Sequence, residues 1–158
     1  MAKGRGKRKA APGDVATNRS ASYRYTLSDR IEAGIVLTGT EVKSLREGQA
    51  QLKDSYAMIR DGEVWLVGTY IAPYGPAARD NHEPERDRKL LLHAREIARL
   101  TQRTAERGWT IVPTRIYFRD GRAKVEIALG RGKDTHDKRE AIRDRDIARD
   151  VARQLAER

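Results

Sequence analysis

The sequence predicts a mainly β fold: a small antiparallel β-barrel with two or three peripheral helices and flexible basic termini. Three observations lead to this prediction. The large apolar side chains are concentrated between residues 19 and 130, short segments of alternating polarity recur there, and two turns between such segments are Asp-Gly pairs. Asp-Gly supplies the positive-φ positions that tight hairpin turns need. With five or six short strands and one helix between the hairpin pairs, an OB-like barrel fits these segments best.

Composition divides the 158 residues into three parts. Residues 1–18 are basic and contain several Gly and Pro, so we expect a disordered basic arm. Residues 19–130 hold nearly all the large apolar side chains, and we expect them to form one folded body. Residues 131–158 are charged at 16 of 28 positions and form a tail.

Periodicity predicts the elements of the body in order. Residues 23–27 alternate and favour a strand, and residues 31–37 place an apolar side chain at every second position, as in a half-buried strand. A short helix follows, with Thr40 as its candidate N-cap and Gly48 as its stop. The remaining elements are two Asp-Gly hairpins (residues 56–67 and 109–129), a long loop (72–89), a short buried segment (90–92) and a second helix (93–107).

The tail has a helical pattern from residue 138 to residue 158. Ile147, Val151 and Leu155 recur at every fourth position. A second stripe at the same spacing consists of Arg145, Arg149 and Arg153. Like charges stacked in this way oppose an isolated helix, whereas an anionic partner would favour it. We therefore expect the tail to be largely unfolded alone and to form a helix on binding.

Several kinds of chemistry are excluded or unsupported. The chain has no cysteine, which excludes a disulfide framework, a thiol nucleophile and Cys-ligated metal centres. Its three histidines (His82, His93 and His136) lack metal-ligand spacing, and the Gly-rich stretch at residues 130–133 lacks P-loop spacing. We expect no metal, no cofactor and no catalysis. No apolar run reaches the roughly 18 residues of a membrane span, so we expect a cytoplasmic protein.

The charge balance points to nucleic acid. The chain carries 33 Lys and Arg against 23 Asp and Glu, a net charge of +10. Basic residues lie in both extensions, where they can follow a phosphate backbone. Nine aromatic residues, none in an evident stacking platform, argue against a general single-strand binder and favour structured RNA.

Five ordered motifs resemble one family. Residues 32–46 read EAGIVLTGTEVKSLR and closely resemble the signature of the SsrA-binding proteins, also called small protein B. Four shorter motifs match in order: DSYA from residue 54, RKLLLH from 88, KVEIAL from 124 and DKR from 137. The resemblance covers the chain from Asn18 to about Arg145.

The resemblance implies a function and a division of labour. Members of this family bind the tRNA-like domain of transfer-messenger RNA and act in trans-translation, the rescue of stalled ribosomes, without catalytic activity. The implied OB-type barrel would bind the RNA. The tail would enter the decoding centre and the vacant message channel, against small-subunit ribosomal RNA. We expect a monomer.

The resemblance also assigns residues. In the body it implies RNA contacts for Asn18, Arg19, Glu32, Lys43, Arg46, Leu91 and His93. A carboxylate such as Glu32 can accept hydrogen bonds from base N–H groups or hold a neighbouring cation. In the tail it implies ribosome contacts for Lys133, His136, Asp137, Lys138 and Arg139, with the stripe of Arg145, Arg149 and Arg153 facing RNA. Asp134 stands where the family usually has a second Lys.

Two other functions remain open at this point. One is a structural ribosomal protein or a general binder of structured RNA with the same barrel. The other is an RNA-cleaving enzyme with His82 or His93 as the base, for which the sequence offers no nucleophile or metal partner.

Overall fold

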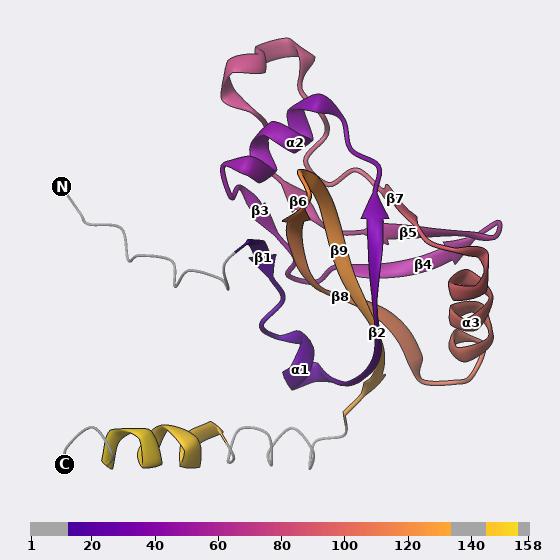
Figure 1. Ribbon diagram of the computed structural model, residues 1–158, viewed down its shortest axis with the longest axis vertical. Coiled ribbons are helices and arrows are strands. Elements are labelled where there is room, and N and C mark those ends of the chain that lie inside the picture. The colour runs from indigo at the N-terminus through magenta and orange to yellow at the C-terminus, as the bar shows by residue number, and fades with distance from the viewer. Residues whose placement is uncertain (1–12, 134–144, 155–158) are drawn as a thin grey trace.

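The computed structural model describes residues 13–133 and 145–154 (Figure 1). In chain order its elements are β1 (Asp14–Thr17), α1 (Ala21–Arg24), β2 (Tyr25–Ile35), α2 (Gly39–Arg46), β3 (Ala50–Gln51), β4 (Tyr56–Arg60), β5 (Glu63–Val67), β6 (Tyr70–Ile71), the 3-10 helix η1 (Gly75–Asp80), β7 (Arg88–Leu91), α3 (Ala94–Thr104), β8 (Trp109–Arg119) and β9 (Arg122–Gly132). Residues 145–154 are helical. The mainly β prediction is confirmed.

Six of the nine described strands pair into a ring, and β3 and β6 form a separate two-stranded sheet. The main sheet has the order β1-β8-β4-β5-β7-β2-β9, and β9 pairs again with β8. Six antiparallel strands therefore close on themselves, and β1 is added outside the ring against β8. In Figure 1, α2 lies at one end of this barrel, α1 lies at the opposite end, and α3 lies against one side.

Both Asp-Gly hairpins form as predicted. Strands β4 and β5 turn at Asp61 (φ 51°) and Gly62 (φ 75°), and β8 and β9 turn at Asp120 (φ 51°) and Gly121 (φ 76°). Positive φ at both turn residues is the geometry whose twist matches that of the flanking strands. The turns thereby fix the register of two strand pairs.

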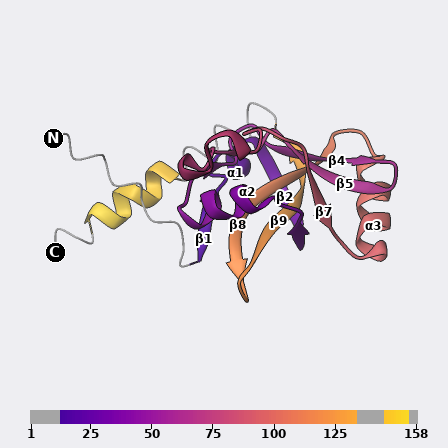
Figure 2. The same cartoon turned by 90° about the horizontal axis from the view of Figure 1, so that it is seen from above.

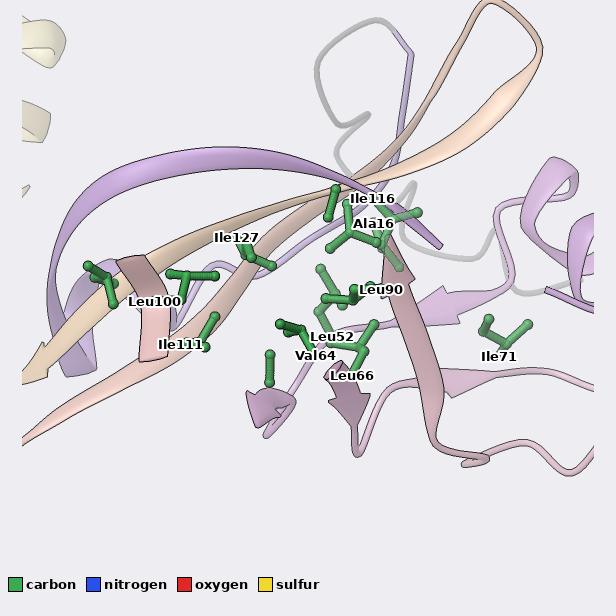
Figure 3. Packing of buried hydrophobic residues seen from close by; sticks show 14 of the residues in the cluster. Ala16, Leu52, Val64, Leu66, Ile71, Leu90, Leu100, Ile111, Ile116 and Ile127 are labelled. Atoms are coloured by element: carbon green, nitrogen blue, oxygen red, sulfur yellow. The ribbon is translucent and has the colours of Figure 1, made fainter. Parts of the chain in front are cut away.

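The core fills the inside of the ring (Figure 3). Side chains alternate along much of the strands, so that Ala33, Val125 and Ile127 are fully buried, whereas Glu32, Lys124 and Glu126 are at least partly exposed. Leu45 of α2 and Leu100 of α3 are also buried and join the same cluster. Ile97 of α3 packs against the cluster beside them, so the two helices cover the barrel with a few apolar side chains.

Three predicted boundaries in the N-terminal part and the tail need correction. The predicted arm of residues 1–18 overlaps β1, where Ala16 is buried and the Asp14 carboxylate pairs with Arg115 of β8. The predicted strand at residues 23–27 is wrong for Tyr23 and Arg24, which lie in α1. Strand β9 continues to Gly132, beyond the predicted end of the body at residue 130. Residues 1–12, which hold most of the arm, and the predicted helix start at residue 138 lie outside the described residues.

Helix α2, the first helix predicted from the sequence, begins two residues earlier than predicted. Its N-cap is Thr38, not Thr40, because the Thr38 side chain accepts a hydrogen bond from the Glu41 amide and the Glu41 carboxylate accepts one from the Thr38 amide. This reciprocal pair is a capping box. The predicted loop at residues 72–89 contains η1 and the start of β7. None of the described helices is long and apolar enough to cross a bilayer.

Candidate nucleic-acid interface

Strand register gathers polar side chains on the outer face of the barrel. One row runs from Leu91 of β7 through Gly34 of β2 and Lys124 of β9 to Tyr117 of β8. The next row runs from Glu32 through Glu126 to Arg115. We call this surface the polar sheet face and define it by Glu32, Leu91, Arg115, Tyr117, Arg119, Lys124 and Glu126.

Glu32 is held in place by two residues of β8. The Tyr117 hydroxyl donates a hydrogen bond of 2.5 Å to its carboxylate, and the Arg119 guanidinium donates another of 3.1 Å. The Tyr117 hydrogen bond and the nearby Arg119 cation lower the pKa of Glu32. Burial and the hydrogen bond to Glu32 raise the pKa of Tyr117 to about 12. At neutral pH, Glu32 is therefore an anion and Tyr117 a neutral donor.

Beside Glu32, Arg115 is neutralised by two acids. Its guanidinium donates to Glu126 and to Asp14, each at 2.8 Å. These hydrogen bonds raise the pKa of Arg115. Burial alone would raise the pKa of Glu126, but hydrogen bonds from Arg115, Arg30 and Thr114 lower it overall. Arg115 therefore stabilises the sheet and adds little positive charge to the surface.

Leu91 is an exposed apolar residue on this face. It is 53% exposed, which contradicts the prediction that residues 90–92 are a buried segment, although Leu90 is buried. A Cβ placed on Gly34 would lie 3.2 Å from the Leu91 Cβ, so Leu91 packs directly over the glycine. Two residues later, His93 is exposed, and its backbone amide donates to Glu96 at the start of α3.

Helix α2 presents two cations near the end of the barrel where β8 turns into β9. Lys43 lies 5.5 Å from the centre of the Tyr74 ring, and Arg46 lies 5.7 Å from that of Phe118, next to the β8–β9 turn. Beneath them, the buried Glu41 carboxylate accepts hydrogen bonds from Arg86 and from the fully buried Arg88. Arg88 also donates to the backbone carbonyl of Thr69 at 2.7 Å. This cluster ties α2 to β7.

Asn18 and Arg19 follow β1 at the edge of β8. The Asn18 side chain donates to the Pro113 carbonyl at 2.9 Å, and its amide donates to the Thr114 carbonyl at 2.7 Å. Asn18 therefore has a structural role in continuing the β1–β8 pairing. Arg19 is exposed.

The tail residues form a separate group near α1. The Lys133 ammonium donates to the Ser22 carbonyl at 2.8 Å, and the Arg145 guanidinium lies 5.5 Å from the Tyr23 ring centre. Arg149 and Arg153 are exposed on the helical residues 145–154. His136, Asp137, Lys138 and Arg139 lie outside the described residues.

The structure thus brings Glu32 and Leu91 onto one face, with Arg46 at its end, and separates them from Lys133 and Arg145. Sequence reasoning missed Tyr117 and Arg119. Their alternation within residues 115–119 places them on one face of a strand, but only the register across β9 shows that this face also carries Glu32.

Comparisons with known proteins cover most of the chain. The family model described as SmpB protein matches residues 15–157. The SsrA-binding protein of a Sulfurihydrogenibium species is 57% identical over 137 residues, covering 87% of this chain and 90% of the relative. That of Mesorhizobium japonicum is 55% identical over 154 residues, covering 96% and 97%.

A similar solved structure points to the same family as these relatives. It is described as "tmRNA-SmpB: a journey to the center of the bacterial ribosome" and aligns with a TM-score of 0.65 at 46% identity, over 80% of this chain and 93% of the solved one. Family model, relatives and solved structure all cover more than two thirds of the chain. On these matches, and with four of the five family motifs on one barrel, the chain belongs to the SmpB family of SsrA-binding proteins.

Proposed function

We propose that this protein binds the tRNA-like domain of transfer-messenger RNA and brings it to stalled ribosomes in trans-translation. The observation that carries the proposal is family membership at more than half identity over nearly the whole chain. The solved relative, whose description pairs tmRNA with SmpB and the bacterial ribosome, supports it.

The two groups of residues support a division of labour. The polar sheet face combines an anionic acceptor (Glu32), an exposed apolar side chain (Leu91) and cations, a mixture suited to splayed bases and sugar hydroxyls of folded RNA. Asn18, Arg19, Lys43, Arg46 and His93 extend this RNA-binding surface in the proposal. The tail leaves the barrel beside α1, at the end opposite α2 (Figure 1). It can therefore reach a second partner while the face is occupied.

The tail contacts the ribosome in this proposal. Arg145, Arg149 and Arg153 face ribosomal RNA, together with Lys133, His136, Asp137, Lys138 and Arg139. Figure 2 shows the helical residues 145–154 on one side of the barrel and α3 on the other. The tail helix becomes fully ordered in the decoding centre and message channel. The protein acts in the cytoplasm as a monomer, by binding and not by catalysis.

A competition titration tests the RNA partner. Labelled tRNA-like domain is bound to the full chain and challenged with a folded RNA of equal length and with single-stranded RNA, at two salt concentrations. We expect a strong preference for the tRNA-like domain that persists at the higher salt, because contacts beyond phosphates do not depend on counterion release. Equal competition by all three RNAs would instead support a general binder of structured RNA.

A tail variant tests the division of labour. Replacing Asp137, Lys138 and Arg139 together by alanine is expected to leave binding of the tRNA-like domain within about twofold and to abolish peptide tagging in a reconstituted translation assay. Loss of RNA binding by this variant would show that the tail and the face do not act separately.

A further inference from the structure

The two donors on Glu32 converge on one of its two oxygens. Both the Tyr117 hydroxyl and the Arg119 guanidinium donate to Oε2, at 2.5 Å and 3.1 Å. Among the described residues, no hydrogen bond reaches Oε1. The side chain is 35% exposed. One oxygen is therefore engaged by the protein, and the other remains available to a ligand.

Tyr117 is a rigid donor. It is only 8% exposed, and the Arg115 guanidinium lies 4.2 Å from the centre of its ring. Arg115 is fixed in turn by Glu126 and Asp14. A tyrosine has few rotatable bonds, so it loses little entropy when it holds the carboxylate. The position of Glu32 is thus set by packed residues of β1, β8 and β9.

The free oxygen determines what the carboxylate recognises. Oε1 accepts hydrogen bonds and cannot donate them while Glu32 is ionised. It repels phosphate. It suits one N–H or O–H donor, which in RNA means the amino group of a base or a ribose 2′-hydroxyl. A ligand that needs both carboxylate oxygens would have to compete with Tyr117 and Arg119.

We propose that Tyr117 and Arg119 are positioning residues that hold the Glu32 carboxylate so that only Oε1 faces the RNA, where it accepts one hydrogen bond from a base amino group or a 2′-hydroxyl. This inference rests on the proposed function. It gives Tyr117 and Arg119, which already belong to the polar sheet face, a positioning role, and it gives Glu32 a chemical specificity.

A double-mutant cycle on binding of the tRNA-like domain tests this role. Tyr117→Phe removes only the hydroxyl and is expected to weaken binding about 3- to 10-fold, the range of one hydrogen bond. In a Glu32→Gln background the same change is expected to cost less than about twofold, because the group that Tyr117 positions has been altered. The slope of log affinity against log salt is expected to be unchanged, since no cation is lost.

Further variants distinguish a positioning role of Tyr117 from effects on folding and from the loss of a positive charge. Tyr56→Phe alters an exposed tyrosine of β4 and is expected to bind as the wild type does. Arg119→Gln, at an exposed position, provides a second cycle with Glu32 that does not depend on the buried tyrosine. Arg122→Gln, an exposed arginine three residues along the hairpin, corrects for loss of one positive charge.

Each outcome bears on one proposal. Coupling of Glu32 with both Tyr117 and Arg119 supports the positioning role. Equal losses in the wild-type and Glu32→Gln backgrounds, with binding by the unchanged protein intact, overturn it and leave the proposed function standing. Failure of the wild-type protein to prefer the tRNA-like domain overturns the proposed function itself.

Discussion

At the scale of single residues, Glu41 is a fully buried carboxylate. Glu41 and Arg88 are both fully buried, and Arg86 and the Thr38 amide supply further donors to the carboxylate. Burial raises the pKa of Glu41, but hydrogen bonds from Arg86, Thr38 and Arg88 outweigh it and lower the pKa below the ordinary 4.5. The cluster serves the face indirectly, because it fixes the helix that carries Lys43 and Arg46.

Removing this carboxylate is expected to destabilise the whole barrel. Glu41→Gln leaves Arg88 buried without its counter-charge, which costs about 3 kcal/mol or more of unfolding free energy. Since the folded-state pKa is depressed, the stabilisation is present above the unfolded value of 4.5 and is lost as pH falls through the lower folded value. Urea denaturation at a series of acidic pH values measures both effects.

The matched control is Glu85→Gln, an exposed glutamate next to Arg86 in sequence. It is expected to change the free energy of unfolding by less than about 0.5 kcal/mol. Equal stability of the Glu41 and Glu85 variants would show that the buried cluster contributes nothing.

At the scale of elements, the close contact between β2 and β7 determines the position of the Leu91 side chain on the polar sheet face. Gly34 has no side chain, so Leu91 of the neighbouring strand lies across it and remains half exposed. Glu32 is two residues from Gly34 in β2 and therefore lies on the same face. A glycine in a strand marks this close approach.

Gly34→Ala is expected to displace Leu91 and to weaken binding of the tRNA-like domain about 3- to 10-fold. The added Cβ would lie 3.2 Å from the Leu91 Cβ, which forces the leucine to shift. Gly39→Ala is the control: its added Cβ meets nothing within 4 Å, and alanine favours the first turn of α2. Titrations of both variants measure the effect, and unchanged affinity of Gly34→Ala would mean that the position of Leu91 is unimportant.

Elements with local signals were predictable, and those with distant partners were not. Each Asp-Gly turn is specified by two adjacent residues. The capping box at residues 38–41 also has a local signal, Thr-x-x-Glu, which favours Thr38 over Thr40. By contrast, β1 has only four residues, and its pairing with β8, about a hundred residues away, makes it a strand. Tyr117 and Arg119 were missed for the same reason, since their meeting with Glu32 depends on a three-strand register.

At the scale of the whole molecule, the barrel and the tail join at Lys133. Its amide donates to the Arg24 carbonyl at 3.0 Å and its ammonium to the Ser22 carbonyl at 2.8 Å. These bonds continue the β2–β9 pairing, which ends with Tyr25 opposite Gly132. The folded unit therefore includes Lys133, although composition predicted its end at residue 130.

A chain that ends after Lys133 is expected to keep the fold and the RNA affinity but to lose tagging. We expect a melting temperature within about 3 °C of the full chain and an affinity for the tRNA-like domain within about threefold. A chain that ends after Gly130 lacks two pairs of the β2–β9 ladder and is expected to melt earlier. Calorimetry and titration of both chains measure these effects, and equal melting temperatures would place the end of the folded unit at residue 130.

The closed ring has a further consequence for how the protein is made. The strand that completes the ring is β9, the last strand among the described residues, and it pairs Gly132 with Tyr25, 107 residues earlier (132 − 25). Contacts between such distant residues slow folding, because the loop must close before any bond is gained. During synthesis the hairpin β4–β5 can form early, but β2 has no partner on its β9 side until β9, which begins at Arg122, has emerged. The barrel therefore closes only after β9 has been synthesised.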